Sequence, residues 1–381
     1  MPLFVYVLGL AVFAQGTSEF MASGLVPGIA GELSVPAGAA AALTSAYAVG
    51  MIVGAPAMAV LSARWPRRRA LAGFLTAFVI VHVIGAVTTS FPLLFGTRVV
   101  AAVVNAGFLA VAMPVAVALA PEGKQARATA ILLAGITLSC VAGVPAGAVL
   151  GDLAGWRSAF WAVAALCIPA LVLVFRSAPA DAVSPQDVSI KREARELKSP
   201  PVRQAMFLAA LVNGATFATF AFLAVIATDV THLPGGAVSG LLAAFGVGAF
   251  LGVTVAGRKG DGALRRGLVL ALCVLPVGWA ALAAAGAQPI ALFVLTTVQG
   301  GLSFGCGSAL VARVMHVAPG APTLGGSFAT VALNVGAFLG PVLAGFVTES
   351  AGDYRYAIWI SAAIALVPLP FVLRRKVPIR S

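Results

Sequence analysis

Long apolar segments fill most of this chain of 381 residues, and each is about as long as a bilayer is thick. A helix needs roughly 20 apolar residues to cross the hydrocarbon core. Only 9% of the residues are charged and 61% are hydrophobic, whereas about a quarter of the residues in a soluble domain are charged. Because unpaired backbone groups are costly in hydrocarbon, these segments must be helical. We therefore predict an all-α, polytopic membrane protein.

The order of apolar and polar segments predicts twelve transmembrane helices. The expected spans, to within several residues, are 3–27, 38–62, 70–90, 92–119, 127–150, 157–176, 204–229, 236–257, 264–286, 289–314, 321–348 and 355–373. One long polar stretch near the middle of the chain mixes both charges with several prolines, as a solvated linker does. We expect an N-terminal six-helix bundle (1–176), a cytoplasmic linker (177–203) and a C-terminal six-helix bundle with a basic tail (204–381).

The 24 Lys and Arg residues are distributed unevenly among the connections. All except Arg98, Arg157 and Arg355 lie in alternate connections or in the C-terminal tail, and hence on one side of the predicted bundle. Connections rich in Lys and Arg stay in the cytoplasm. We therefore expect a multi-pass protein of the inner (plasma) membrane with both termini cytoplasmic. A nucleic-acid partner is not expected. Proteins that bind nucleic acid gather their basic residues on one face, whereas here the basic residues lie in short clusters between apolar segments.

The two predicted halves repeat a short pattern at corresponding places. An Ala-Gly pair is followed by an Arg and, four residues later, by a Trp; the Arg is Arg157 in the first half and Arg355 in the second. Parallel repeats of membrane helices are related by an axis along the membrane normal and bind substrate at mid-depth between them. We expect two pseudo-symmetric bundles with a substrate site at their interface.

Glu19 is the one acidic residue of the twelve that lies well inside a predicted span. A charged side chain at the bilayer centre costs at least about 2.5 kcal/mol, so it normally faces the bundle interior and marks a functional site. We predict that Glu19 takes up and releases a coupling proton. The alternative is a carboxylate that only ties helices together.

Arg98 is the only basic residue well inside a span. Counting back from Pro27 and forward from Pro92 at about 1.5 Å per residue places Glu19 and Arg98 at similar depth, roughly 9–12 Å below the outer surface. We expect the two side chains to pair, or to communicate through water or substrate. A static ion pair is the alternative.

Other polar and aromatic side chains inside spans are candidates for substrate contact, although hydrogen bonding and packing between helices explain such residues equally well. The candidates are Gln15, Glu19, Tyr47, Asn105, Phe108, Asn213, Phe217, Phe220, Gln299, Phe304 and Asn334. His82 is the only histidine well inside a span and is a further candidate proton carrier. The four cysteines are far apart, so neither a metal site nor a disulfide framework is expected.

Together these features resemble the major facilitator superfamily along the whole chain. The loop at 61–69 (LSARWPRRR) resembles the family's basic gating loop, with Arg64 and Arg68 in register but Ala63 in place of the family's Asp. The fifth span resembles the family's antiporter motif, which implies a kinked helix that packs closely against the other half. Residues assigned to gating or helix packing on this basis are Arg64, Arg68, Gly143, Pro145, Gly147 and Pro341.

Three segments look like those of actinobacterial chloramphenicol exporters: 13–21 (FAQGTSEFM), 43–47 (LTSAY) and 64–69 (RWPRRR). The resemblance implies proton-coupled efflux of small drug-like molecules, chloramphenicol or related phenicols, by alternating access. It also implies a monomer that needs no cofactor beyond the proton-motive force. Export of a sugar or purine nucleoside metabolite is the alternative. An enzyme is not expected, because no clustered catalytic set lies at either membrane face.

Overall fold

Helices dominate the molecule, and no strand occurs in the part of the chain that the structure describes. The computed structural model describes residues 1–62, 65–122, 124–177, 190–258, 261–321 and 324–370. Within these residues, eleven helices are long and apolar enough to cross a membrane. A twelfth apolar helix, α15 (Arg355–Leu366), is shorter. The predicted all-α membrane fold is confirmed.

The N-terminal half consists of α1 to α7. These are α1 (Leu3–Leu33), α2 (Ala37–Leu61), α3 (Arg67–Val87), α4 (Phe91–Ala118), α5 (Gln125–Leu138), the π-helical turn η2 (Ser139–Gly143), α6 (Val144–Ala154) and α7 (Arg157–Ser177). Segments α5, η2 and α6 together form the fifth span.

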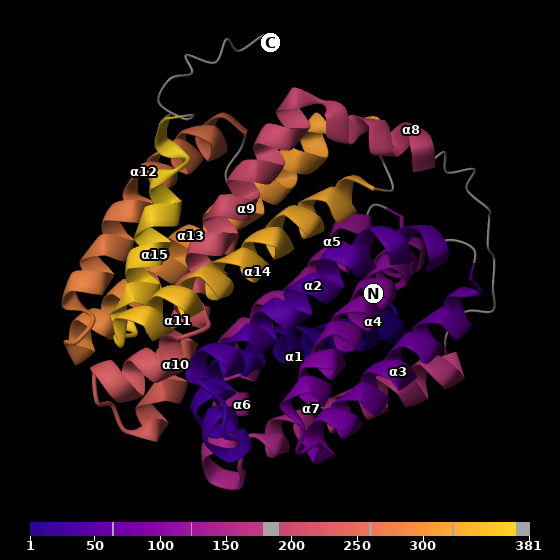
Figure 1. Ribbon diagram of the computed structural model, residues 1–381. Coiled ribbons are helices and arrows are strands. Elements are labelled where there is room, and N and C mark those ends of the chain that lie inside the picture. Colours follow the sequence, from indigo (N-terminus) through magenta and orange to yellow (C-terminus); the bar gives the residue numbers. More distant parts are fainter. Residues whose placement is uncertain (63–64, 123, 178–189, 259–260, 322–323, 371–381) are drawn as a thin grey trace.

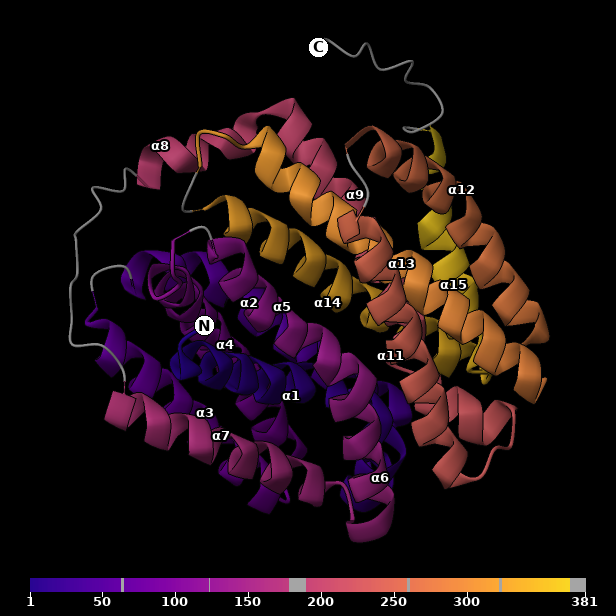
Figure 2. The same cartoon turned by 180° about the vertical axis from the view of Figure 1, so that it is seen from behind.

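The C-terminal half follows two short linker helices, α8 (Ile190–Ala194) and η3 (Arg195–Lys198). It comprises α9 (Pro200–Phe220), α10 (Leu223–Val225), η4 (Ile226–Val230), α11 (Gly235–Arg258), α12 (Asp261–Ala285), α13 (Pro289–Val317), α14 (Gly325–Ala351) and α15. Figures 1 and 2 show the two halves side by side, with α8 at one end of the molecule, which we call the linker end; the other end is the distal end.

Corresponding helices pack in the same way in both halves. The contact of α2 with α4 is repeated by α11 with α13, that of α3 with α7 by α12 with α15, and that of α1 with α5 by α9 with α14. Glycines permit the closest of these approaches: a Cβ on Gly54 would lie 2.8 Å from Val103 Cα, and one on Gly252 would lie 2.7 Å from the Gly301 carbonyl carbon. Small residues serve this purpose in membrane helices generally.

One predicted span boundary is wrong because proline does not end the helix. α1 continues past Pro27 to Leu33 rather than ending near 27. In hydrocarbon the helix remains the only way to satisfy the backbone, so one missing N–H is tolerated. In the fifth span, the π-helical turn η2 ends two residues before Pro145 and adjusts the helix where the proline removes a donor.

Two seams join the halves. Along the first, α2 packs against α14: Ser45 Oγ donates to the Phe338 carbonyl (3.0 Å), and Ser327 Oγ donates to the Ala55 carbonyl (3.3 Å). Along the second, α11 packs mainly against η2 and α6 and only slightly against α5. The second seam is therefore closed at the distal end and sparsely packed toward the linker end.

The linker helices are fastened to the C-terminal half. The buried carboxylate of Glu193 in α8 accepts a hydrogen bond from the backbone N–H of Leu324 (2.8 Å), directly before α14. A negative charge is favourable at the start of a helix. At the other boundary of the predicted linker, α7 ends at Ser177, and residues 178–189 lie outside the described residues.

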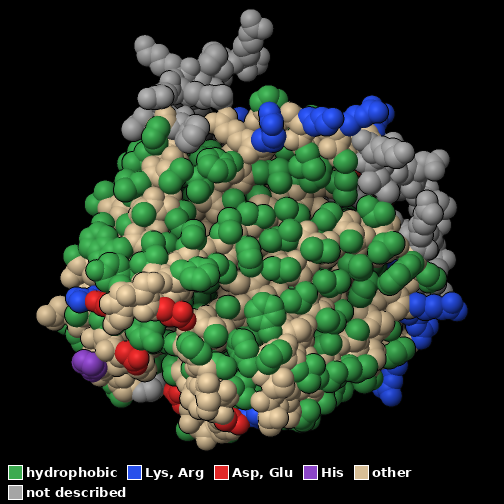
Figure 3. Space-filling model, in the orientation of Figure 1, with side chains coloured by type: hydrophobic (Ala, Val, Ile, Leu, Met, Phe, Trp, Pro, Cys, Tyr) green, Lys and Arg blue, Asp and Glu red, His purple; other side chains and the backbone are tan. Residues whose placement is uncertain are grey.

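The molecular surface matches a protein embedded in lipid. In Figure 3 hydrophobic side chains cover the broad middle of the visible face. Most Lys and Arg side chains in this view lie along the upper and right margins, and most Asp and Glu side chains lie at the lower left. Large apolar residues such as Ile290 (81% exposed) and Val277 (68% exposed) point outward from their helices. Such patches mark a membrane contact.

Candidate functional site

Helix α1 positions Glu19 by packing tightly against the fifth span. A Cβ on Gly16 would lie 3.2 Å from Ser139 Cβ, and Gly143 lies directly against Thr17. These contacts turn one face of α1 toward η2 and α6. Glu19 lies on another face of α1 and is half-buried.

Arg98 contacts Glu19, but it contacts the backbone carbonyl of Glu19 and not the carboxylate. Arg98 of α4 is almost fully buried (1% exposed). Its Nη2 donates to the backbone carbonyls of Ser18 (2.6 Å) and Glu19 (3.3 Å), and its Nη1 donates to Ser18 Oγ (2.8 Å). Among the described residues, no ion pair joins Arg98 to the Glu19 carboxylate. The guanidinium is thus fastened to the backbone of α1.

Polar atoms without partners surround this pair. The Arg98 guanidinium lies over the Tyr47 ring, 4.7 Å from its centroid. Within the described structure, four buried side chains here have atoms without a hydrogen-bond partner: Gln15 (Nε2 and Oε1), Tyr47 (OH), Arg98 (Nε) and Asn105 (Oδ1). Buried polar groups are normally satisfied, so such a cluster indicates where water or a ligand binds.

An aromatic ladder extends from this polar cluster into the C-terminal half. Phe20, next to Glu19 on α1, lies 5.9 Å from Phe217 of α9 by ring centroids. The ladder continues from Phe217 to Phe220 (5.7 Å), to Phe245 of α11 (4.7 Å) and to Phe304 of α13 (5.8 Å). Aromatic pairs at such distances attract one another and present a wide apolar surface. A polar cluster on one half therefore adjoins an aromatic surface on the other.

Several predicted contact residues are engaged elsewhere. The Asn213 amide donates to the Leu333 carbonyl (2.7 Å), the Asn334 amide to the Thr330 carbonyl (2.9 Å), and the Gln299 amide to the Leu275 carbonyl (3.0 Å). These bonds lie within the C-terminal half. Phe108 is fully buried in the apolar core.

The fifth span packs against the other half as its motif implies, but not through its glycines. Gly143 and Gly147 face α1, where a Cβ on Gly147 would lie 3.5 Å from Met21 Cβ. Contact with α11 is made by the backbone around Cys140, where a Cβ on Gly246 would lie 2.6 Å from the Cys140 carbonyl carbon. Pro341 is buried inside α14, one residue beyond Gly340, which lies against α9.

The basic loop is described only in part. Arg64 lies outside the described residues. Arg68, at the start of α3, donates through Nη2 to the Phe175 carbonyl near the end of α7. This bond joins α3 to α7 within one half, so Arg68 does not touch the other half through it.

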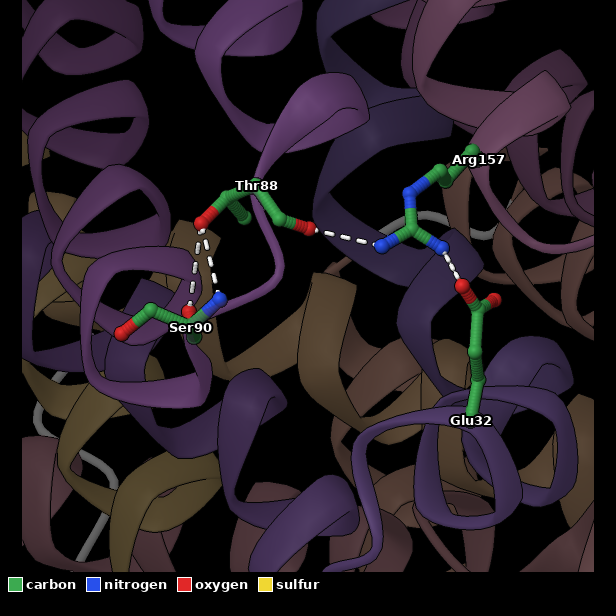
Figure 4. A network of polar contacts seen from close by, with 4 residues as sticks. All are labelled: Glu32, Thr88, Ser90 and Arg157. Atoms are coloured by element: carbon green, nitrogen blue, oxygen red, sulfur yellow. Dashed lines mark hydrogen bonds and ion pairs between the residues drawn. The ribbon is translucent and has the colours of Figure 1, made fainter.

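Arg157, singled out from the repeat, fastens three helix ends together at the distal end. Its guanidinium donates to the Glu32 carboxylate at the end of α1 and to the Thr88 carbonyl after α3 (2.8 Å), as Figure 4 shows. The guanidinium also lies 4.4 Å from the centre of the Trp156 ring. Its counterpart Arg355 bonds instead to Asp353 in its own turn (2.9 Å).

Sequence reasoning missed Ser18, Phe20 and Phe245. Ser18 and Phe20 flank Glu19 in the chain, and this adjacency was the available signal. Phe245 lies in an apolar span and carries no such signal.

Comparison with known proteins agrees with this architecture. A sequence model described as Major Facilitator Superfamily matches residues 8–322. A chloramphenicol resistance protein of Streptomyces lividans is 50% identical over 378 residues, 97% of this chain and 96% of that protein. The inner membrane transport protein YdhP of Escherichia coli strain K12 is 32% identical, with 97% and 96% covered.

Among solved structures, the nucleoside transporter NupG has the same fold. Its crystal structure superposes with a TM-score of 0.77 at 15% sequence identity, covering 97% of this chain and 98% of that one. Fold, family match and relatives thus agree on a multi-pass membrane transporter rather than an enzyme. The chain belongs to the Major Facilitator Superfamily.

Proposed function

We propose that this protein exports chloramphenicol or related phenicols by exchange for protons. The observation that carries the proposal is the pairing of the polar cluster around Glu19 with the aromatic ladder of the C-terminal half. A phenicol has an aromatic ring at one end and hydroxyl and amide groups at the other. The ring matches the ladder, and the polar end matches the Gln15 amide, the Tyr47 hydroxyl and the Asn105 Oδ1 atom, which have no hydrogen-bond partner among the described residues.

The relative from Streptomyces lividans supports this choice of substrate, because it is named for chloramphenicol resistance and is half identical along nearly its whole length. A neutral molecule also suits a site with one carboxylate. In the proposed pocket we retain Gln15, Glu19, Tyr47, Asn105, Phe217, Phe220 and Phe304, and we add Phe20 and Phe245. Asn213, Gln299, Asn334 and Phe108 are set aside. The amides of Asn213 and Gln299 bond to neighbouring helices, that of Asn334 bonds within its own helix, and Phe108 is buried in the apolar core.

Glu19 is the proposed proton carrier. It is half-buried, lies beside the pocket, and among the described residues has no cation within ion-pair distance. Release of its proton toward the cytoplasm and uptake from outside would be coupled to rocking of the two halves. At a proton-motive force of roughly 150 mV, one proton supplies about 3.5 kcal/mol, enough for a few-hundred-fold gradient of a neutral solute.

Access from the cytoplasm or the inner leaflet is proposed through the second seam. Lys and Arg concentrate in the connections at the linker end, which favours a cytoplasmic position for that end and for both termini in the inner membrane. The sparse packing between α5 and α11 lies at the same end. No cofactor and no partner protein enter the proposal, and a monomer suffices for the cycle.

A Glu19→Gln variant tests the proposal. Purified protein in proteoliposomes is given chloramphenicol, and the drug-driven movement of protons is measured. The wild type should move protons when drug is added. Glu19→Gln should not, because an amide cannot take up and release a proton as a carboxylate does. Glu122→Gln, an exposed acid in a loop, is the matched control and should behave as the wild type. Unchanged coupling in Glu19→Gln would refute the mechanism.

The alternative substrate is a sugar or a purine nucleoside, which the amide and hydroxyl groups of the polar cluster also suit. The same assay with these solutes distinguishes the two. Proton movement with a nucleoside or sugar and none with phenicols would replace the substrate and leave the role of Glu19 intact.

A further inference from the structure

Ser18 and His82 form a hydrogen-bonded chain that ends on Arg98. His82 of α3 is almost fully buried (1% exposed). Its Nδ1 lies 2.7 Å from the Phe78 carbonyl oxygen, and its Nε2 lies 2.6 Å from Ser18 Oγ. Ser18 Oγ also lies 2.8 Å from Arg98 Nη1. The chain joins α3, α1 and α4.

With a neutral imidazole, the hydrogen bonds of this chain can run in only one direction. A carbonyl oxygen accepts, so His82 Nδ1 carries a proton and donates to Phe78. A guanidinium only donates, so Ser18 Oγ accepts from Arg98. The hydroxyl proton of Ser18 is then directed to His82 Nε2, which is an acceptor in the neutral imidazole. Each hydrogen bond of the chain then has one donor and one acceptor.

We propose that Ser18 and neutral His82 are positioning residues that hold Arg98 on the backbone of α1 and thereby keep its guanidinium off the Glu19 carboxylate. The inference rests on the proposed role of Glu19 as proton carrier.

The surroundings of His82 exclude a second positive charge. Its ring lies 4.2 Å from the Phe78 ring and 5.9 Å from the Phe160 ring by centroids. A proton on Nε2 would take the place of the Ser18 hydroxyl proton and set an imidazolium two hydrogen bonds away from Arg98. Like charges so close in a buried site repel strongly. His82 therefore orients other groups and does not carry the proton, contrary to its candidacy from sequence.

Release of Arg98 from α1 would impair coupling. A free guanidinium next to Glu19 would form a charge-assisted, two-pronged pair with the carboxylate. A carboxylate locked in such a pair remains ionised and no longer alternates between protonated and ionised forms. The bonds to the Ser18 and Glu19 carbonyls prevent this by occupying Nη2.

Three variants test the inference in proteoliposomes. Ser18→Ala removes the middle of the chain. His82→Asn keeps a polar group near Phe78 but does not reach Ser18, whereas His82→Gln places an amide oxygen where Nε2 lies and restores the acceptor. Drug-driven proton movement and the Kd for chloramphenicol are measured for each.

Ser18→Ala removes the hydrogen bond between Arg98 and the Ser18 hydroxyl, and His82→Asn removes the acceptor that directs this hydroxyl. Both variants should therefore slow proton movement about tenfold. His82→Gln should remain within about twofold of the wild type. The Kd should stay within about twofold for all three, because none of them lines the pocket. The double variant Ser18→Ala/His82→Asn should be no slower than either single variant, because both break the same chain.

Two outcomes would overturn the inference. Wild-type coupling in Ser18→Ala would show that the chain does not position Arg98. Equal defects in His82→Gln and His82→Asn would assign His82 to ring packing alone. Loss of coupling in Glu19→Gln together with normal coupling in Ser18→Ala removes only this inference, whereas normal coupling in Glu19→Gln removes the proposed function itself.

Discussion

The two halves share a helix arrangement but differ in what they bury. Corresponding helices pack in the same way, along glycine seams at α2–α4 and α11–α13. The N-terminal half buries Arg98 and His82 and partly buries Glu19. Among the described residues, the buried polar side chains within the spans of the C-terminal half are uncharged, such as the Thr219–Ser361 hydroxyl pair between α9 and α15 (2.6 Å).

In the proposed transport cycle, this difference separates two tasks within one repeated architecture. A change of protonation in the N-terminal half alters the charge on one side of the interface only. The aromatic surface of the C-terminal half is indifferent to that change and is suited to an apolar group. A repeat unit can thus be duplicated for its packing while its interior diverges in chemistry.

Among the variants that test this difference between the halves, Arg98→Met should have the largest effect on transport. The variant keeps an unbranched side chain but removes three hydrogen bonds from a buried cation, so transport in cells or proteoliposomes should fall about 100-fold or more. Arg355→Met, an exposed arginine of the C-terminal half, should stay within about twofold. If Arg98→Met transported at half the wild-type rate, the buried charge of the N-terminal half would not be needed for transport.

Phe217→Ala should have the next largest effect, and it tests the C-terminal half. Phe217 contacts both Phe20 and Phe220, so its removal interrupts the ladder. We expect the KM for chloramphenicol transport to rise about tenfold, since truncating a buried aromatic costs more than 1 kcal/mol of contact. Phe346→Ala is the control, because Phe346 is 69% exposed on the outside of α14. Equal effects of the two variants would remove the ladder from the proposed pocket.

Gly252→Ala tests the feature that the halves share. The new methyl group would be forced against the Gly301 backbone, and such overpacking costs about 1–3 kcal/mol. The apparent melting temperature of the purified protein should fall, and Gly54→Ala in the other half should lower it similarly. Gly257→Ala, five residues further along α11 with open space at its Cβ, should leave it unchanged. A harmless Gly252→Ala would show that the seam tolerates a wider spacing.

Arg157→Ala and Arg355→Ala should show the smallest difference. Arg157 joins the ends of three helices, whereas Arg355 bonds within one turn. Exposed ion pairs contribute about 1 kcal/mol or less, so we expect a small fall in melting temperature for Arg157→Ala and none for Arg355→Ala. Raising the salt concentration should reduce the difference in melting temperature between the two variants. A larger loss in Arg355→Ala would contradict the assignment of these contacts.

Some features of this protein follow from the sequence by itself. Hydropathy determined the helical membrane fold, because only a helix satisfies the backbone in lipid over such lengths. The lone acid and base inside spans singled out Glu19 and Arg98 as candidate functional residues, because burying charge is costly. Counting residues along the helices predicted that Glu19 and Arg98 lie at a similar depth, and the contact of Arg98 with the Glu19 carbonyl agrees with this.

Only the tertiary structure decided which way each side chain points. Gln299 and Asn213 have the same sequence signature as Gln15, yet their amide nitrogens are bonded to neighbouring helices, whereas neither polar atom of the Gln15 side chain has a partner among the described residues. Arg98 bonds to the Ser18 hydroxyl and to the Ser18 and Glu19 carbonyls rather than to a carboxylate. The rotation of a helix about its axis depends on close packing with its neighbours, and an apolar span that faces lipid on one side and protein on the other leaves almost no periodic signal of that rotation in its sequence.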